Sequence, residues 1–242
     1  MEKLSRAIIV AAGEGTRLRP VTLKTPKPLV RVNGTRLIDT SVNALKNNGI
    51  HEIYIVCGYK IEKFREAFAD DPEIHIIENP WFEQGNNITS LYAARQYLPG
   101  AFVLEGDLLI RNEAVMVSET EKSGYCASWV DETDEWTLQT EGERILSCCP
   151  TGGRSTWRLW GISMWTGKDG ELLKELIREQ FEDRHNWSIY WDEIAMLTQP
   201  EKFDLYIRKV SDGDIVEIDT LEELAQIDPS YKDLLDLKAK QQ

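Results

Sequence analysis

A glycine-containing loop that directly follows a short apolar segment constrains the fold of this chain more than any other feature. Residues 7–10 read Ala-Ile-Ile-Val, a continuous apolar run typical of a strand buried on both faces of a parallel sheet. The loop after it consists of Ala11, Ala12, Gly13, Glu14, Gly15, Thr16 and Arg17. Glycines let the backbone turn sharply, and successive inward N–H groups form an anion-binding concavity. The pattern predicts a phosphate-binding loop at the end of a strand.

Two cationic side chains specify the kind of phosphate site. Arg17 offers a planar fork suited to phosphate oxygens, and Lys27, held between Pro26 and Pro28, offers a mobile point charge. The dinucleotide-binding fingerprint requires a third small residue, but Leu18 stands at that place. The Walker loop ends in Gly-Lys-Ser/Thr, which this sequence lacks. A nucleoside triphosphate is therefore the expected ligand, bound by a loop that is neither the dinucleotide-binding fingerprint nor the Walker loop.

These motifs resemble those of a known family. The order Ala-Ala-Gly-x-Gly-Thr-Arg-Leu-x-Pro, followed by Pro-Lys-Pro-Leu, resembles the nucleotidyltransferases that make NDP-sugars and CDP-alcohols, and the likeness runs from Arg6 to about Leu224. Within that family the chain is most similar to bacterial choline-phosphate cytidylyltransferases. That narrower likeness is carried by residues 84–92, 134–136, 190–192 and 217–219.

Hydrophobic periodicity predicts alternating strands and helices before residue 112. Strands are expected at 7–10, 52–57, 73–78 and 101–105, and helices at 37–49, around 64–68 and at 88–97. This βαβ order predicts a parallel sheet with right-handed crossovers. In open α/β sheets ligands bind outside the carboxyl ends of the strands. The glycine loop, a polar loop ending at Asn87 and the Asp107 turn are therefore expected to face one crevice.

The pattern changes after Asn112, where short strands predominate. Strands are expected at 124–130, 136–140, 144–149, 158–165, 204–210 and 214–218, and helices at 168–181, 191–197 and from residue 220. We expect an α/β fold with a Rossmann-like, mostly parallel central sheet flanked by helices and a smaller, mixed, β-rich half. The predicted unit spans residues 1–228, with a nucleotide-binding half (1–112), an acceptor-binding half (113–228) and a helical tail (229–242).

The charge and the apolar segments exclude several classes of function. The net charge of −13 argues against binding to nucleic acid or to an anionic membrane. No apolar run approaches the roughly 20 residues needed to span a bilayer, and residues 1–6 have no signal-peptide core. A cytoplasmic protein without membrane insertion is expected, and a homodimer is compatible with the sequence.

Carboxylates at strand ends are the candidate metal ligands. Asp107 follows an apolar strand and a glycine, and Glu217-Ile218-Asp219 ends another strand. Either aspartate alone has a structural interpretation, as a turn former or as a cap for the helix near Thr220. The resemblance implies that Asp107 and Asp219 bind Mg²⁺, with Glu217 a weaker third ligand. Mg²⁺ prefers one or two carboxylates together with phosphate oxygens and water.

Aromatic residues beside carboxylates point to a cationic acceptor. A quaternary ammonium has no N–H to donate, so aromatic faces and a nearby carboxylate recognise it. The resemblance implies that Trp136, Tyr190 and Asp192 bind choline, with Trp157 and Glu217 as additional walls. Most other tryptophans of the second half are expected to pack in the core.

Two asparagines are the candidate base-binding residues. Asn86 and Asn87 offer both donor and acceptor groups, as a pyrimidine edge requires. Asn87 alternatively caps the helix that follows it. The resemblance implies cytosine, whereas the residues themselves do not distinguish CTP from UTP or dTTP.

The working hypothesis is the reaction of CTP with phosphocholine, which gives CDP-choline and pyrophosphate. Arg17 and the loop N–H groups would hold the β- and γ-phosphates, and Lys27 would bridge the α-phosphate and the attacking phosphate. Mg²⁺ bound to Asp107 and Asp219 would stabilise an in-line transition state, with no covalent enzyme intermediate. Lys27, Arg17 and Asp107 are thus the candidate catalytic residues.

Three alternatives remain open. The first is a CTP-dependent enzyme for a primary-amine acceptor such as 2-aminoethylphosphonate or phosphoethanolamine, because acidic residues crowd positions 131–135. The second is nucleotidylation of a sugar 1-phosphate. The third is a non-catalytic regulatory subunit, which predicts loss of Arg17, Lys27, Asp107 or Asp219; all four are present.

Overall fold

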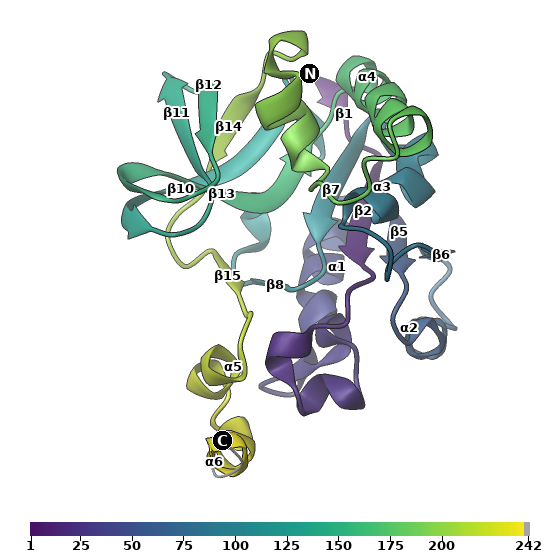
Figure 1. The fold of residues 1–242 in the computed structure, drawn as a ribbon, viewed down its shortest axis with the longest axis vertical. Helices are drawn as coiled ribbons and strands as arrows, with labels where there is room; N and C mark the ends of the chain where they lie inside the picture. Colours follow the sequence, from purple (N-terminus) through teal and green to yellow (C-terminus); the bar gives the residue numbers. More distant parts are fainter. Residues whose placement is uncertain (240–242) are drawn as a thin grey trace.

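The centre of the molecule is a nine-stranded mixed sheet (Figure 1), and the computed structural model describes residues 1–239. In spatial order its strands are β10 (Gly124–Thr133), β14 (Tyr206–Lys209), β12 (Arg144–Cys149), β11 (Thr137–Glu141), β13 (Gly153–Met164), β7 (Ala101–Glu105), β2 (Arg6–Ala11), β5 (Glu52–Cys57) and β6 (Ile74–Glu78). Three strand pairs lie outside it: β1 (Glu2–Lys3) with β9 (Glu119–Thr120), β3 (Arg31–Val32) with β4 (Thr35–Arg36), and β8 (Leu108–Ile110) with β15 (Ile215–Glu217).

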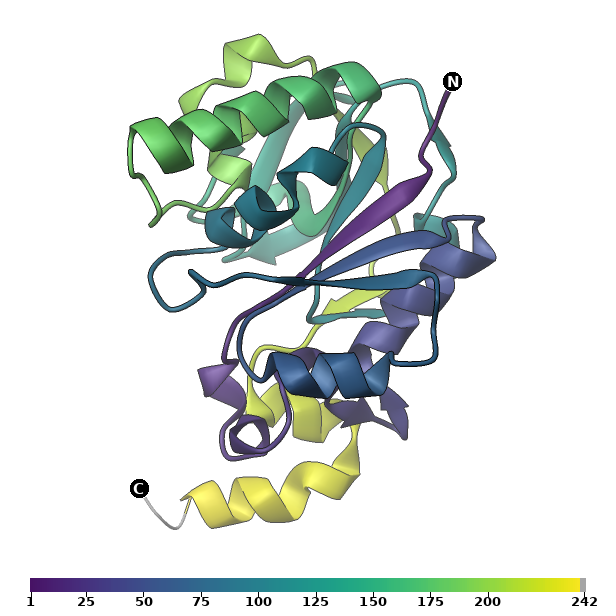
Figure 2. The same cartoon turned by 90° about the vertical axis from the view of Figure 1, so that its right-hand side faces the viewer.

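Helices cover both faces of the parallel part of the sheet. The α-helices are α1 (Leu37–Asn47), α2 (Ile61–Ala67), α3 (Ile88–Ala94), α4 (Gly167–Arg178), α5 (Leu221–Ile227) and α6 (Lys232–Ala239). Figure 2 shows α3 and α4 on one side of the strands and α1 and α2 on the other. Among the described helices, none combines the length and the apolar character needed to cross a bilayer.

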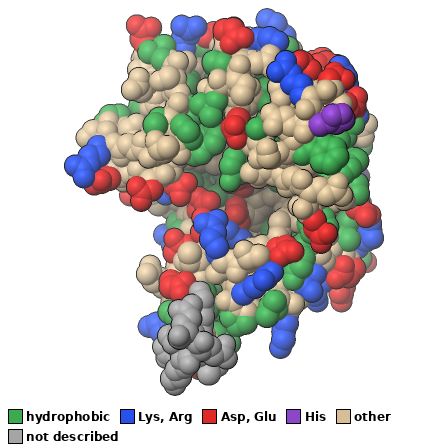
Figure 3. All heavy atoms as spheres, in the orientation of Figure 1, with side chains coloured by type: hydrophobic (Ala, Val, Ile, Leu, Met, Phe, Trp, Pro, Cys, Tyr) green, Lys and Arg blue, Asp and Glu red, His purple; other side chains and the backbone are tan. Residues whose placement is uncertain are grey.

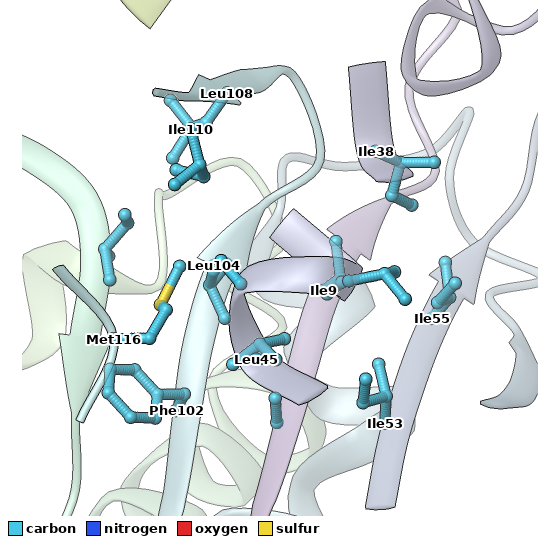
Figure 4. Packing of buried hydrophobic residues seen from close by; sticks show 14 of the residues in the cluster. Ile9, Ile38, Leu45, Ile53, Ile55, Phe102, Leu104, Leu108, Ile110 and Met116 are labelled. Atoms are coloured by element: carbon cyan, nitrogen blue, oxygen red, sulfur yellow. The ribbon is translucent and has the colours of Figure 1, made fainter. Parts of the chain in front are cut away.

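Strands β7, β2, β5 and β6 run parallel and have apolar side chains on both faces. In β2, Ala7 and Ile9 face the core under α1, whereas Ile8 faces the core under α3 and α4. Figure 4 shows Ile9 packed among Ile38 and Leu45 of α1 and residues of the adjacent strands. Burial on both faces explains why these strands read as continuous apolar runs in the sequence.

A third, smaller core lies behind the glycine loop. It joins Leu18 and Val30 of the N-terminal segment to Ile218, Leu221 and Leu224 near the C-terminus. Leu234 and Leu235 of α6 pack against this core. Figure 1 shows α5 and α6 beside the N-terminal turns, far from α4. The C-terminal segment thus packs behind the glycine loop near the N-terminus and supports it.

The sheet changes from parallel to antiparallel where β13 pairs with β7. β10, β11 and β12 then extend the sheet as a β-rich layer, closed by β14. The predicted α/β fold, with a parallel sheet flanked by helices and a β-rich second half, is confirmed. The division of function at residue 112 stays a prediction.

Several boundaries differ from the sequence-based expectation. The predicted helix at 168–181 is α4 followed by a π-helical turn at Glu179–Asp183, and the one at 191–197 is a π-helical turn at Ile194–Thr198. The pair of β8 and β15 joins the ends of the two halves, and β8 was not expected. Of the predicted tail, 229–239 form a 3-10 turn and α6, and 240–242 lie outside the described residues.

Candidate active site

A cleft of about 550 Å³ opens at the carboxyl ends of the parallel strands. Its lining includes the glycine loop, the Asn86-Asn87 loop, the Asp107 turn, and residues of the β-rich half and of the segment before α5. Figure 3 shows acidic and basic side chains gathered at the hollow between the upper and lower parts of the view. The three strand-end loops that were expected to face one crevice do so.

The glycine loop lies directly against the segment that carries Lys27. Gly15 has φ +61°, and a Cβ there would lie 2.9 Å from the Cβ of Lys27. The Thr22 hydroxyl donates to the Gly15 carbonyl at 2.9 Å and fixes the loop from the other side. Only glycine combines this left-handed backbone with such a close approach. The loop therefore positions Arg17 and Lys27 on one wall of the cleft.

Lys27 joins the two predicted metal carboxylates. Its side chain is buried, and its Nζ lies 2.7 Å from Asp107 Oδ2 and 2.8 Å from Asp219 Oδ1. Burial alone lowers the pKa of Lys27, but Asp107 and Asp219 outweigh that effect and raise it. The lysine is thus cationic and, in this structure, held by the groups predicted to bind Mg²⁺.

Asp219 receives a second cation, because Arg17 Nη2 lies 2.9 Å from its Oδ1. The alternative that Asp219 caps the next helix is wrong. Thr220 caps α5 through a reciprocal pair of hydrogen bonds with Glu223. Glu223 also accepts the backbone N–H of Asp219 at 2.7 Å. The carboxylate of Asp219 is therefore free to face the cleft.

Acidic side chains surround this cluster and fit a divalent cation. Glu105, Asp107 and Glu217 form one group whose oxygens lie within 4.8 Å of one another, and Glu135, Glu217 and Asp219 form another. Asp107 Oδ1 is buried and has no hydrogen-bond partner in the part of the chain that the structure describes. An oxygen left open beside several carboxylates suits a hard cation such as Mg²⁺.

Glu217 lies at the border between the metal carboxylates and the β-rich half. Arg158 Nη2 donates to its Oε2 at 3.1 Å. Burial, followed by the charges of Asp107 and Asp219, raises the pKa of Glu217 to about 7. The guanidinium of Arg158 opposes only part of that rise. Glu217 lines the cleft, as expected of both roles that the sequence suggested for it.

Asn86 and Asn87 connect the cleft to the segment 187–191. The Asn86 N–H donates to the Trp187 carbonyl at 2.7 Å, and Asn87 Oδ1 accepts the Trp191 N–H at 3.0 Å. Asn87 occupies the N-cap position of α3, as the alternative interpretation expected, but its side chain makes no capping bond to the helix. Its amide instead lies 3.5 Å from Glu105 Oε1. Both asparagines line the cleft.

Trp136, Tyr190 and Asp192 all line the same cleft. The Trp136 and Tyr190 rings lie 6.1 Å apart at 78° and form two perpendicular walls. Asp192 is 8% exposed, and its Oδ1 lacks a hydrogen-bond partner among the residues the structure describes. Burial raises the pKa of Asp192 to about 7, and the neighbouring Tyr125 phenol opposes part of that rise.

Two predicted site residues lie apart from this lining. Trp157 is half-buried and packs edge-on against Trp129, with ring centroids 5.4 Å apart. It lies two residues before Leu159, where β13 passes the cleft. Glu14 is held by Arg19 at 2.7 Å. The other predicted residues of the glycine loop, Ala11, Ala12, Gly13, Gly15, Thr16 and Arg17, do line the cleft.

Sequence reasoning did not find several cleft residues. They are Asn79, Phe82, Gly85, Thr89, Ser90, Glu105, Gly106, Leu159 and Gly161, whereas Glu135, which also lines the cleft, belongs to the acidic run noted in the sequence. Glu105 is the most consequential, since burial and then the charges of Asp107, Glu217 and Asp192 raise its pKa well above the usual range. Its position as the last residue of an apolar strand was the available signal.

Comparison with known proteins identifies the sequences that this chain resembles. The family model described as Nucleotidyl transferase matches residues 6–131. A 2-aminoethylphosphonate cytidylyltransferase of Lancefieldella rimae is 32% identical over 96% of this chain and 95% of its own length. A choline-phosphate cytidylyltransferase of Streptococcus pneumoniae is 28% identical over 94% of this chain and 98% of its own length.

Solved structures show the same fold. The CTP:phosphocholine cytidylyltransferase of Streptococcus pneumoniae superposes with a TM-score of 0.86 at 27% identity, covering 93% of this chain and 98% of the other. The inositol-1-phosphate CTP transferase of T. maritima has a TM-score of 0.77 at 21% identity and covers 96% of each chain. The second likeness concerns the fold alone.

Proposed function

The chain belongs to the nucleotidyl transferase family, and from this premise we propose that it transfers CMP from CTP to a small acceptor. The acceptor carries a phosphate or phosphonate at one end and a cationic nitrogen at the other. One observation carries the proposal: the cleft that is lined by Arg17, Lys27 and Asp107 is also lined by Trp136 and Asp192. Triphosphate chemistry and cation recognition therefore share one cavity.

The roles follow from position in the cleft. The N–H groups of the glycine loop and Arg17 would hold the β- and γ-phosphates, which leave as pyrophosphate. Lys27 would contact the α-phosphate and the attacking oxygen, and would reduce the repulsion between the two anions. Because the acceptor oxygen is already anionic, no side chain has to remove a proton from it. Catalysis consists of positioning and charge stabilisation.

Asp107 and Asp219 would hold Mg²⁺, with Glu217 as a further ligand. The open Asp107 Oδ1 supports this assignment. A bound Mg²⁺ would neutralise charge on the α-phosphate. Lys27 and Arg17 already pair with these carboxylates. When the metal and the triphosphate enter, the carboxylates would therefore bind the metal, and Lys27 and Arg17 would bind the phosphates in place of the carboxylates.

Phosphocholine is the acceptor supported by the aromatic walls. Its trimethylammonium has no N–H and is recognised through ring faces, each contributing on the order of 0.5–2 kcal/mol. Trp136 and Tyr190 present two such rings beside the Asp192 carboxylate. The Streptococcus pneumoniae relative is named for this acceptor.

2-Aminoethylphosphonate is the second candidate, and a different observation favours it. Glu105, Glu135, Asp192 and Glu217 all line the cleft, and carboxylates bind a primary ammonium through charge-assisted hydrogen bonds. The Lancefieldella rimae relative is named for this acceptor. Both candidates fit the same reaction and differ only in the head group.

The test is pyrophosphate release with Mg²⁺, measured for four NTPs against phosphocholine, 2-aminoethylphosphonate, phosphoethanolamine and glucose 1-phosphate. Turnover is expected with CTP and at least one acceptor that carries a cationic nitrogen. Turnover with glucose 1-phosphate alone would assign the chain to sugar nucleotide synthesis. Absence of turnover in every combination would favour the regulatory alternative.

Replacement of Trp136 tests the acceptor end separately. Trp136→Ala is expected to raise the KM for the acceptor roughly 5- to 30-fold and to leave the KM for CTP within about twofold, because the indole packs with Tyr190 and is not part of the glycine loop. Trp129→Ala is the matched control, since Trp129 is 52% exposed on the sheet and does not line the cleft. Equal effects on both KM values would remove Trp136 from the acceptor site.

A further inference from the structure

Two parts of the chain that are distant in sequence lie side by side at the cleft: an asparagine loop (85–87) and an acceptor segment (187–192). The side-chain oxygen of Asn87 accepts the backbone N–H of Trp191 at 3.0 Å, across 104 positions of the chain. The residues on either side of Trp191 both line the cleft, as does the whole asparagine loop. This hydrogen bond therefore holds the backbone that carries the proposed acceptor-binding side chains.

Gly85 allows the loop and the segment to approach each other. A Cβ at this position would lie 2.4 Å from the Trp187 carbonyl oxygen and 2.8 Å from the Trp187 Cβ. The same carbonyl accepts the Asn86 N–H at 2.7 Å, so a shift that relieved the overlap would also break this hydrogen bond. Because the carbonyl belongs to the backbone, it cannot move aside alone, as the end of a flexible side chain can. A larger residue in place of Gly85 would therefore displace the acceptor segment.

Other contacts anchor the acceptor segment at its two ends. Trp187 stacks on Phe181, with ring centroids 4.9 Å apart at 14°, and its indole N–H donates to the Phe181 carbonyl at 2.9 Å. At the other end, the Glu193 carboxylate accepts the Tyr190 N–H at 2.9 Å. Asn87 holds the backbone between these anchors. Its side chain therefore sets how closely the middle of the segment lies to the asparagine loop.

The hydrogen-bonding groups of the two asparagine side chains are already engaged within the protein. The Asn86 oxygen accepts the Asn87 N–H at 2.8 Å, and the Asn86 amide lies 3.5 Å from the Ser188 carbonyl. The Asn87 oxygen accepts the Trp191 N–H, and the Asn87 amide lies 3.5 Å from Glu105 Oε1. Recognition of a pyrimidine edge requires free donors and acceptors. These contacts favour a positioning role for Asn87 over the base-binding role expected from the sequence.

We propose that Gly85 and Asn87 are positioning residues that hold the acceptor segment against the nucleotide side of the cleft, and so set the distance between the acceptor and the α-phosphate. This inference rests on the proposed function and adds the residues that align its two substrates. Neither residue has to touch the acceptor, because both act through the backbone of the acceptor segment. Misplacement by about 1 Å at a contact of this kind can cost about 100-fold in rate.

The first test compares two variants by steady-state kinetics, with the acceptor that the wild type turns over fastest. Asn87→Leu removes the oxygen that accepts the Trp191 N–H, and Gly85→Ala separates the loop from the segment while both asparagines stay in place. Both variants are expected to lower kcat/KM for the acceptor roughly 10- to 100-fold and to leave the KM for CTP within about threefold. The ratio of kcat/KM for CTP to that for UTP should equal the wild-type ratio.

Asn47→Leu is the matched control, because Asn47 is exposed on α1 and its amide pairs with Glu113 outside the active-site cleft; its kinetic constants should equal those of the wild type. A raised KM for CTP or a changed preference between CTP and UTP in Asn87→Leu, with the acceptor constants unchanged, would make Asn87 a base-binding residue and overturn the proposal. Wild-type kinetics in both Asn87→Leu and Gly85→Ala would overturn it as well.

Hydrogen exchange gives a second readout that does not depend on turnover. Without ligands, the amides of the acceptor segment should exchange about 2- to 10-fold faster in Asn87→Leu and Gly85→Ala than in the wild type, and at the wild-type rate in Asn47→Leu. Unchanged exchange in the first two variants would show that the asparagine loop does not restrain the segment. Faster exchange together with a wild type that turns over no acceptor would overturn the proposed function instead, and would leave both residues with a structural role only.

Discussion

Lys27 connects the metal carboxylates to the phosphate loop through a single ammonium group. Two prolines flank it, and its side chain is buried against Gly15 while its Nζ reaches Asp107 and Asp219. Its charge therefore bears on the stability of the empty cleft and, in the proposed reaction, on the stabilisation of the transition state.

Lys27→Met is expected to lower kcat about 100- to 1000-fold, because the attacking and leaving phosphates lose their shared cation. It should also cost at most about 3 kcal/mol of unfolding free energy, since both carboxylates are partly exposed. Pyrophosphate release and urea unfolding measure the two effects. Lys46→Met is the control, because Lys46 pairs with Asp71 and Glu73 outside the active-site cleft; a similar loss of kcat there would contradict a specific role for Lys27.

Asp192 predicts the pH dependence of acceptor binding. Burial raises its pKa from 3.8 to about 7, and Tyr125, Glu193, Cys148 and Glu105 are the titratable groups that face it. Only the ionised carboxylate attracts a cation, so the KM for the acceptor should fall about tenfold between about pH 6 and pH 8. The same slope in Asp192→Asn, assayed with the same acceptor at each pH, would contradict this.

Protonation of Asp192 also affects stability, with a defined sign. The native state holds this proton more tightly than the unfolded state, because its pKa is raised. The contribution of the protonated Asp192 to the free energy of unfolding is therefore fully present below pH 3.8 and is lost as the pH rises to about 7. Relative to Asp192→Asn, the wild type should lose unfolding free energy across that window. Urea titrations at several pH values check the direction.

At the scale of elements, the conformation of the glycine loop depends more on Gly15 than on Gly13. Gly15 has φ +61° and touches Lys27, whereas a Cβ on Gly13 would meet nothing within 4 Å. Gly15→Ala should cost about 1–3 kcal/mol of unfolding free energy, and Gly13→Ala should change it by less than about 0.5 kcal/mol. Urea unfolding of the two variants decides, and equal costs would mean that the contact with Lys27 is unimportant.

Local sequence patterns were enough to predict the site residues whose position is set by a single strand, helix or loop. Lys27 was identifiable from its two prolines, and Asp107 from its place after a buried strand. Glu105 was missed because the space for its carboxylate depends on Gly161, which belongs to a strand on another stretch of the chain. Asn87 was correctly placed at the start of a helix, but the hydrogen-bond partner of its side chain, Trp191, lies on a distant segment. Pairing between distant segments is not encoded in local periodicity.

The same reasoning explains the aromatic residues. The sequence favoured Trp136, which adjoins acidic residues, and offered Trp157 only as an additional wall; Trp136 lines the cleft and Trp157 does not. The register of β11 and β13 pairs Trp157 with Leu138 and places Leu159 and Gly161 at the cleft. The strand order was predictable for the parallel part, where helices alternate with strands. It was not predictable for β14, which inserts between β10 and β12.

At the scale of the whole molecule, the C-terminal segment supports the N-terminal loop. Leu224 of α5 is fully buried in the core that contains Leu18, the neighbour of Arg17. Leu224→Ala should cost about 2–5 kcal/mol and raise the KM for CTP about tenfold, because the loop loses its backing. Leu173→Ala, equally buried but in the core under α4, should cost similar stability without the change in KM. Steady-state kinetics below each variant's melting temperature compare them.

The pairing of Lys27 and Arg17 with Asp107 and Asp219 has a consequence for the reaction cycle. Without substrate, these cationic and anionic side chains form ion pairs with one another. In the proposed reaction, arrival of a metal nucleotide would break these ion pairs, and departure of pyrophosphate would let them form again. Re-formation of these ion pairs would then compete with bound pyrophosphate for Arg17 and Lys27, and would favour its release before the next turnover.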